Sequence, residues 1–223
     1  MSQLDYHSAR LLAFWQRHYV LICAGAVLLV LAVGLLTGYR MVADREAEQA
    51  SARYENMHGA LREQEGDAAL DTLAQFIAAE PNGYGVLAQY RRARRLYEEQ
   101  GEWEEASKIL KTIAANGFLP QPIRDMARLS AAYVQLSHAP AGEIAPLLER
   151  LLADAHPMRH AAREAMAWAL FLEEEYLAAR RYLQLVMDAP EVSPSMRQRC
   201  AALLAVVQRH LYPNKIPQNF EAG

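Results

Sequence analysis

Residues 96–110 read LYEEQGEWEEASKIL, and this stretch decides the fold. A helical pattern runs up to Gly101 and a second pattern begins at Trp103, so the glycine separates two helices. Residues 86–100 repeat apolar side chains at three- and four-residue spacing, and residues 103–115 do the same. The stretch therefore predicts a pair of helices joined by a tight turn.

The rest of the chain repeats this arrangement, and no run of alternating β-branched residues indicates a strand. Further helices are expected at residues 41–64, 68–79, 120–135, 143–153, 158–174, 176–187 and 195–211, with Asp67 as an N-cap of the second. Breaker prolines Pro81, Pro120, Pro157 and Pro194 are 39, 37 and 37 residues apart. Two helices in each such period predict an all-α solenoid of about four helix pairs plus a capping helix.

An ordinary helical bundle is the alternative, because helical pairs can recur by chance. Under either reading the helical domain is expected to span residues 40–211. The remaining residues, 212–223, contain two prolines and no helical pattern, so a flexible tail is expected there.

The turn between the two helices of residues 96–110 also carries a more specific pattern. Its sequence L-Y-x-x-x-G-x-W-x-x-A-x-x-x-L resembles the tetratricopeptide repeat. The resemblance implies that Ala106 is the small residue where paired helices touch. Seventy-three residues later the pattern recurs in part, with Glu174 in place of the glycine; the matching positions are Leu170, Tyr176, Ala179 and Leu183. The first and third units are degenerate.

Residues 19–39 read YVLICAGAVLLVLAVGLLTGY, and the 22 residues between Arg17 and Arg40 contain no acid or base except His18. A helix of that length reaches about 33 Å, enough for a hydrocarbon layer of about 30 Å. We expect a single transmembrane helix here, preceded by a short tail over residues 1–18.

Two other interpretations of the apolar run are weaker. A buried core helix is rarely apolar on all faces over such a length. A cleaved signal peptide has a shorter apolar region and a small-residue cleavage site, and no A-x-A pattern lies at the edge of this run. Small residues within it, including Gly25 and Gly34, predict contact with a partner's membrane helix, although no clean G-x-x-x-G is present. The flanking Lys and Arg residues do not decide the orientation.

Composition and motifs argue against chemistry. The net charge is −3, and a mildly acidic chain lacks the basic surface that nucleic acid requires. There is no phosphate-cradling glycine loop, no G-x-S-x-G and no C-x-x-C. His156 and His160 are four residues apart, but a proline lies between them and no third metal ligand is near. We therefore expect no catalytic residues, no metal, no cofactor and no small-molecule substrate.

A binding surface remains, and two arginines are its first candidates. By resemblance to the groove positions of the repeat, Arg91 and Arg95 face inward, and their spacing places them on one ridge of a helix. They are suited to grip a carboxylate or an acidic segment through bidentate hydrogen bonds. The alternative is that they pair with Glu98, Glu99 or solvent.

In the fourth unit, Glu164, Trp168 and Phe171 occupy the corresponding positions. An exposed tryptophan in a groove is a candidate anchor for a partner protein. A tryptophan buried between helices is the alternative.

The whole layout is similar to one family, the bacterial inner-membrane proteins described as the ancillary subunit of the SecYEG translocon. The resemblance covers about residues 12–208 and is of the α-proteobacterial type. It lies in five short motifs: Phe14-Trp15, Gly38-Tyr39-Arg40, Gly83-Tyr84-x-x-Leu87-Ala88, IRDMARL at residues 123–129, and MRQR at residues 196–199.

This resemblance implies a short cytoplasmic tail, one membrane helix and a periplasmic tetratricopeptide-like domain. It implies a non-catalytic scaffold or cochaperone in the inner membrane, with translocon subunits, periplasmic chaperones or exported clients as partners. An assembly factor or accessory subunit of a respiratory or cytochrome-maturation complex has the same architecture and is the alternative. An enzyme is the third reading, and no group of reactive residues favours it.

Overall fold

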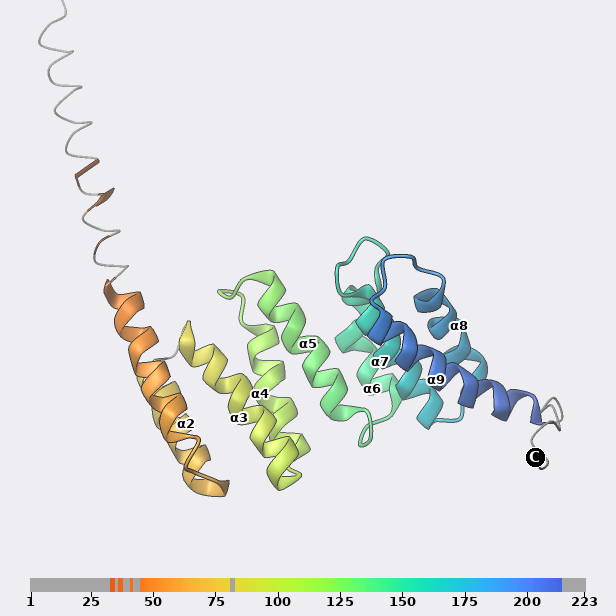
Figure 1. Ribbon diagram of the computed structural model, residues 1–223, viewed down its shortest axis with the longest axis horizontal. Helices are drawn as coiled ribbons and strands as arrows, with labels where there is room; N and C mark the ends of the chain where they lie inside the picture. Colours follow the sequence, from red (N-terminus) through yellow and green to blue (C-terminus); the bar gives the residue numbers. More distant parts are fainter. Residues whose placement is uncertain (1–32, 35, 38–40, 42–44, 81–82, 214–223) are drawn as a thin grey trace, which may run out of the picture. The chain divides into compact units, whose positions relative to one another are not determined.

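The computed structural model describes residues 33–34, 36–37, 41, 45–80 and 83–213, in which helices are joined by turns and no strand occurs (Figure 1). One helix covers residues 45–60. It is followed by α2 (Gly66–Ala79), α3 (Tyr84–Gln100), α4 (Trp103–Ala115), α5 (Gln121–Gln135), α6 (Ala141–Leu148), the 3-10 helix η1 (Glu149–Leu152), α7 (Arg159–Leu172), α8 (Tyr176–Met187) and α9 (Pro194–Leu211). The predicted all-α fold is confirmed for these residues.

The chain divides into two compact units, Met1–His58 and Gly59–Gly223. In the described part of the chain, no helix has both the length and the apolar character needed to cross a membrane. The transmembrane helix predicted at residues 19–39 lies almost wholly outside the described residues, as do its predicted limits. The predicted flexible tail also lies outside them beyond residue 213.

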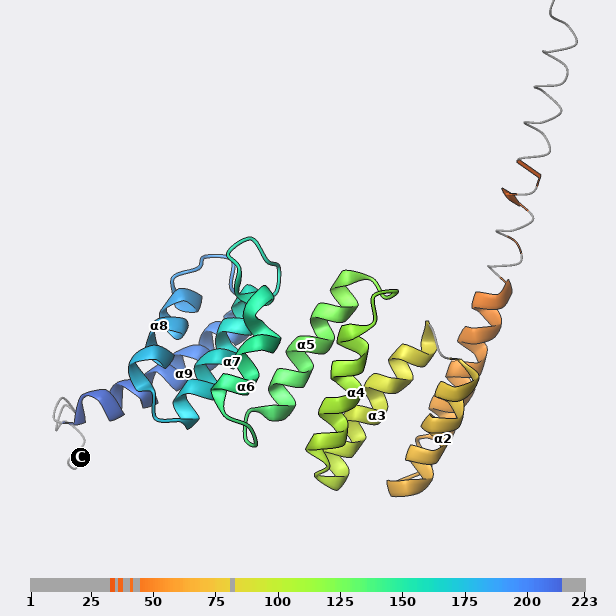
Figure 2. The same ribbon diagram turned by 180° about the vertical axis from the view of Figure 1, so that it is seen from behind.

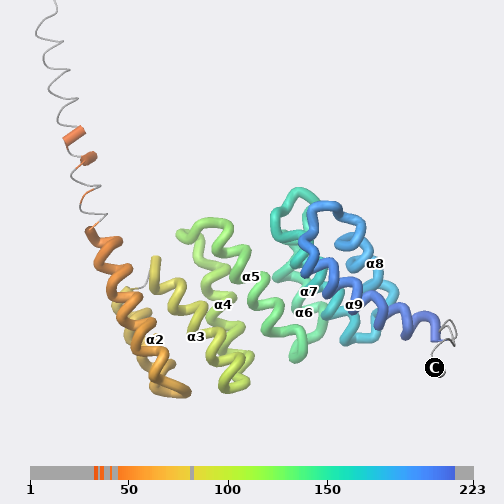
Figure 3. The backbone as a smooth tube through the Cα atoms, viewed as in Figure 1, coloured from red at the N-terminus to blue at the C-terminus, as the bar shows by residue number. Residues whose placement is uncertain are grey.

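In the second unit each helix packs mainly on the helices next to it in the sequence. Helices α3 and α4, α5 and α6, and α7 and α8 form successive pairs, which appear in the same order from both sides (Figures 1 and 2). Contacts between α5 and α7, the first helices of two pairs, join one pair to the next, and α9 packs on α8. The backbone trace in Figure 3 shows the hairpin turn that closes each pair.

The hydrophobic core is distributed along these pairs. One cluster joins α3, α4 and α5, another joins α5, α6, η1 and α7, and a third joins α7, α8 and α9. Leu147 packs against the first two clusters and Tyr182 against the last two, so the apolar contacts pass from pair to pair. This is the packing expected of a solenoid, in which each unit covers its neighbour.

A residue with a positive φ angle forms the tight turn in two of the pairs. Gly101 ends α3 with φ +72°, in the left-handed region, and the N–H groups of Gly101 and Glu102 both point to the carbonyl of Leu96. Seventy-three residues later, Glu174 takes φ +64°, and its carbonyl accepts from the N–H of Tyr176 at 2.8 Å, as that of Gly101 accepts from Trp103 at 2.9 Å. The fourth pair therefore has, at the position of the glycine, a residue that is strained in this conformation.

The small residues of the pattern lie where predicted. Ala106 and Ala179 are completely buried in the helix-pair contacts, and Leu110 and Leu183 are buried beside them. Cys200 is buried in the last cluster, and burial raises the pKa of its thiol to about 11, so it acts as a small apolar residue.

Two local predictions were wrong. Asp67 is not an N-cap: α2 begins at Gly66, and the Asp67 carboxylate instead accepts a hydrogen bond from Gln100 Nε2 at 3.0 Å. The helix predicted at residues 143–153 begins earlier, at Ala141, and ends as the 3-10 turn Glu149–Leu152. By contrast, the bounds expected for residues 103–115 and 176–187 match α4 and α8.

The two equivalent turns make opposite substitutions informative. Gly101→Ala is expected to lower the free energy of unfolding by about 1 kcal/mol, because alanine is strained at φ +72° although no atom lies within 4 Å of its added Cβ. Glu174→Gly is expected to raise it by a similar amount. Urea denaturation followed by circular dichroism measures both, and changes of the same sign would contradict the shared turn geometry.

Candidate protein-binding groove

Two tyrosines hold the first helices of successive pairs in register. Tyr90 on α3 donates its hydroxyl hydrogen bond to the carbonyl of Ile123 on α5 at 2.9 Å. Tyr133 on α5 donates in the same way to the carbonyl of Ala161 on α7 at 3.3 Å. Burial raises the pKa of each hydroxyl to about 12, so both remain protonated donors at neutral pH. The two rings thereby have fixed positions on the surface formed by the first helices.

A groove of about 550 Å³ opens between α3 and α5, beside these tyrosines. We call it the α3–α5 groove; its lining residues are Tyr90, Arg91, Ala93, Arg94, Tyr97, Glu98, Leu110, Ser130, Tyr133 and Val134. Ala93, Leu110 and Val134 are buried and belong to one core cluster, so they form an apolar floor. The charged residues come from α3 alone and lie along one side. The groove therefore suits an apolar side chain with polar or acidic neighbours.

The structure places Arg91 in the lining of the α3–α5 groove, and its predicted role in binding a partner protein stays a prediction. Arg94, which the sequence analysis did not single out, also lines it and pairs with Glu98 at 2.7 Å. Both members of that pair are more than half exposed, so it stabilises the fold little and leaves the arginine accessible. Arg94 is thus a site residue that the sequence reasoning missed.

Arg95 is used in a different way, and the groove lining does not include it. Its Nη2 donates to the carbonyl of Leu61 at 3.1 Å and its Nη1 to that of Gln64 at 3.4 Å, and it pairs with Glu99 at 3.2 Å. The pairing with Glu99 was the alternative left open by the sequence. Partner binding by Arg95 stays a prediction, and it would require these contacts to break.

Glu164 lies on α7 with only 4% of its side chain exposed, and Arg199 of α9 holds both of its carboxylate oxygens at 2.8 Å. These two charge-assisted bonds attach the last helix to the fourth pair. The structure thus gives Glu164 a structural partner within the chain; the predicted role in binding another protein is untested.

Trp168 and Phe171 form an edge-to-face pair with ring centroids 5.9 Å apart. Phe171 continues into the core, with Tyr176 and His210 within 6.0 Å, whereas Trp168 is 37% exposed. Trp168 is therefore partly packed and partly exposed, and its role as an anchor for a partner protein stays a prediction.

The first helices also present apolar side chains that the sequence analysis did not single out. The exposed members are Leu87 on α3, Met126 and Tyr133 on α5, and Leu172 on α7. Helical spacing places each on the stripe that carries the groove residues or Trp168 of the same helix. In the sequence, these apolar residues could have been found by extending the stripe of candidate residues on each helix by three or four positions.

The two histidines weighed as metal ligands have other partners. His156 Nε2 lies 3.2 Å from Asp125 Oδ2, and His160 Nε2 lies 3.1 Å from Glu191 Oε1. Within the described residues no group of three potential ligands surrounds a metal position. Each of these contacts joins the start of the first helix of a pair to the loop that follows the pair.

Asp125 is the most heavily bonded carboxylate of these contacts. Burial acts to raise its pKa, but hydrogen bonds from His156, Gln121 and Arg128 outweigh burial and hold the pKa below its usual range.

Of the two predicted membrane-contact glycines, Gly25 lies outside the described residues. Among the described residues, no side chain lies within 4 Å of a Cβ added at Gly34.

The Glu164–Arg199 pair can be tested by a double-mutant cycle. Arg199→Met leaves a buried carboxylate without its partner, so the free energy of unfolding is expected to fall by about 2 kcal/mol. Glu164→Gln in the same chain should recover much of this loss. The matched control is Arg94→Met, which removes an exposed pair and should change stability by less than about 0.5 kcal/mol. Equal losses for the two arginines would contradict the role of the pair in holding α9.

A family model described as a tetratricopeptide repeat-like domain matches residues 12–165, which is more than half of the chain. No solved structure matches the chain.

Proposed function

Because the chain belongs to the tetratricopeptide repeat-like domain family, we propose that it is a membrane-anchored, non-catalytic scaffold that binds other proteins through the first helices of its pairs. The observation that carries this proposal is the α3–α5 groove with its apolar floor and basic side. The exposed residues Met126 and Trp168 extend the same kind of surface to α7. Accessible apolar and aromatic side chains beside arginines are typical of protein-binding sites.

The fixed positions of these side chains support binding over a purely structural role. Tyr90 and Tyr133 use their hydroxyls within the chain, so their rings are already in place before a partner arrives. A surface that is ordered in advance loses little side-chain entropy on binding. Arg91 and Arg94 lie along one side of the groove and favour an acidic flank on the partner.

The anchor in this proposal is the apolar run of residues 19–39. It lies inside the segment matched by the family model, which begins at residue 12. A membrane anchor raises the local concentration of the helical domain near other membrane proteins, which strengthens weak binding without new contacts. We place the protein in a bacterial inner membrane with its helical domain in the periplasm, on the basis of the sequence resemblance described above.

The finer proposal names the partners: subunits of the Sec translocon, together with periplasmic chaperones or newly exported proteins. Affinity purification of the full chain from detergent extracts tests it directly. Enrichment of translocon subunits over an unrelated single-span protein supports the proposal. Enrichment of respiratory or cytochrome-maturation subunits instead would replace it with the assembly-factor alternative.

A pair of double variants tests whether the first-helix surface binds the partner. Met126→Ser with Trp168→Ser is expected to reduce partner recovery about tenfold, because both remove exposed apolar contact area. The matched control is Leu177→Ser with Leu185→Ser, which removes similarly exposed side chains from α8, a second helix. Quantitative mass spectrometry measures both, and equal losses would exclude the first helices as the specific surface.

The contribution of the membrane run is tested separately. Gly34→Leu adds bulk where no other side chain of the described residues lies within 4 Å of the new Cβ, so the variant should fold and reach the membrane normally. If the partner's membrane helix packs against this position, recovery of the partner should fall severalfold. Arg95→Ala is the comparison, since its contacts lie within the helical domain. Unchanged recovery with Gly34→Leu would remove the predicted contact between membrane helices.

A further inference from the structure

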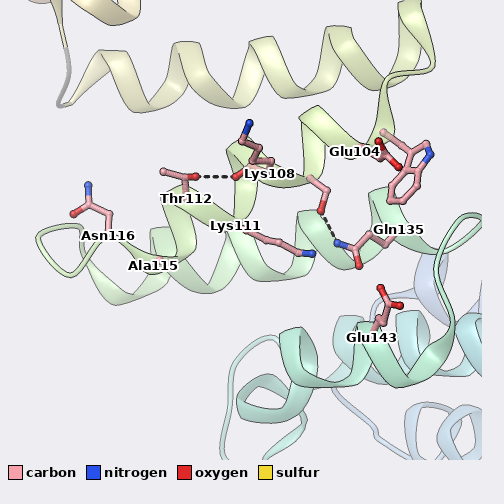
Figure 4. Close-up of a pocket in the computed structure, with 10 residues that line it drawn as sticks. Glu104, Lys108, Lys111, Thr112, Ala115, Asn116, Gln135 and Glu143 are labelled. Carbon is pink, nitrogen blue, oxygen red and sulfur yellow. Dashed lines mark hydrogen bonds between the residues drawn. The ribbon is translucent and has the colours of Figure 1, made fainter.

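A second groove, of about 860 Å³, lies between α4 and the beginning of α6, on the second helices of two pairs (Figure 4). We call it the α4–α6 groove. Its lining residues are Trp103, Glu104, Ser107, Lys108, Lys111, Thr112, Ala115, Asn116, Gln135 and Glu143. They follow α4 from its first turn to its end, so the groove is elongated. No part of the α3–α5 groove is shared with it.

Gln135 carries a polar atom without a partner at this groove. The residue is 1% exposed, its Nε2 donates to the hydroxyl of Ser107, and its Oε1 makes no hydrogen bond. Turning the amide over would leave the nitrogen unpaired instead, since only one neighbour is available. Buried polar atoms are almost always paired, so an unpaired amide oxygen beside a cavity points to a donor supplied from outside.

Charges of both signs surround this amide. Figure 4 shows the Lys111 amine and the Glu143 carboxylate turned toward Gln135 from α4 and α6. Neither residue makes an ion pair with any residue that the structure describes, whereas Lys108 is paired with Glu105 at 3.3 Å. Glu104 stands at the same end of the groove as Trp103, whose ring stacks on His138 with centroids 5.0 Å apart. One end of the groove thus offers acceptors, and its middle offers ammonium groups.

We propose that the α4–α6 groove binds an extended segment of a partner protein that carries a basic side chain and, two residues away, an acidic one. The basic side chain donates to Gln135 Oε1 and to Glu143, and the acidic side chain pairs with Lys111. Residues two apart in an extended chain lie on the same side, about 6.8 Å apart. The 13 residues of α4 span about 20 Å, enough for about six extended residues.

Two features select this occupant. Carboxylates at Glu104 and Glu143 repel a polyanion such as nucleic acid, while Lys111 disfavours a purely cationic ligand, so a segment with both charges is the complementary partner. Gln135 Oε1 is buried, and the Lys111 amine is turned toward this amide. On binding, the flexible Lys111 side chain moves away from the amide and forms an ion pair with the acidic group of the segment. This site is separate from the proposed function of the first-helix surface and does not depend on the membrane anchor.

Fluorescence anisotropy with the full chain in detergent micelles tests the proposal. The probe is the fluorescein-labelled heptapeptide amide GARAEAG, and the reference is GAQAEAG, which lacks the basic side chain. Glu143→Gln and Gln135→Leu are each expected to weaken binding of GARAEAG at least fivefold. GAQAEAG should bind at least fivefold more weakly than GARAEAG. Glu143→Gln should have little further effect on the affinity for GAQAEAG, because this peptide has no arginine to pair with Glu143.

Two controls separate binding from folding. Arg94→Met lies in the α3–α5 groove and should leave the peptide affinity unchanged. Gln135→Leu removes the unpaired oxygen and also the donor to the buried Ser107 hydroxyl, so it is compared in a Ser107→Ala background, where its thermal midpoint should equal or exceed that of Ser107→Ala alone. The proposal is overturned if neither peptide binds, if both bind equally, or if Gln135→Leu lowers the thermal midpoint without changing the affinity, which would assign Gln135 to packing alone.

Discussion

Each helix pair in this chain has an apolar face that only the next pair can cover, and the structure depends on this constraint. The clusters on either side of α7 show it: one side packs on α5 and α6, and the other on α8 and α9. Leu147 and Tyr182 each contact two clusters, so neither cluster is complete without its neighbour. After α7 and α8 the described residues contain no further pair, and α9 covers this pair with Cys200, Leu203 and Val207. A capping helix is what a repeat array requires to end in water.

Polar contacts between pairs follow the same order. The contact of Asp125 with His156 and that of His160 with Glu191 occupy equivalent places, a helix start and the loop before the next pair, with acid and imidazole exchanged. The two contacts therefore connect the same structural positions with the acid and the histidine interchanged, so the position of the contact repeats although the residue types do not. This explains why the repeat is evident in the spacing of helices and weak in the sequence motif.

The sequence predicted most of the helices because their ends depend on local signals. Gly101 and the prolines act over a few residues, so α4 and α8 were bounded correctly. The failures needed tertiary information. Asp67 has the chemistry of an N-cap, but Gln100 from the next helix takes its carboxylate. Helical spacing placed Arg91 and Arg95 on one ridge. Only the structure shows that Arg95 turns toward the carbonyl of Leu61, in the loop before α2.

The same limit applies to the two grooves. Val134 and Gln135 are consecutive in α5, yet the first lines the α3–α5 groove and the second the α4–α6 groove. A helix rotates by about 100° per residue, so one residue is enough to change the face. Which face remains open depends on how the neighbouring helices pack on α5, which the sequence of α5 alone does not specify. The α3–α5 and α4–α6 grooves open on two sides of the same junction, so one helical array can contact two partner segments at once. For a scaffold, this arrangement matters more than any single reactive residue.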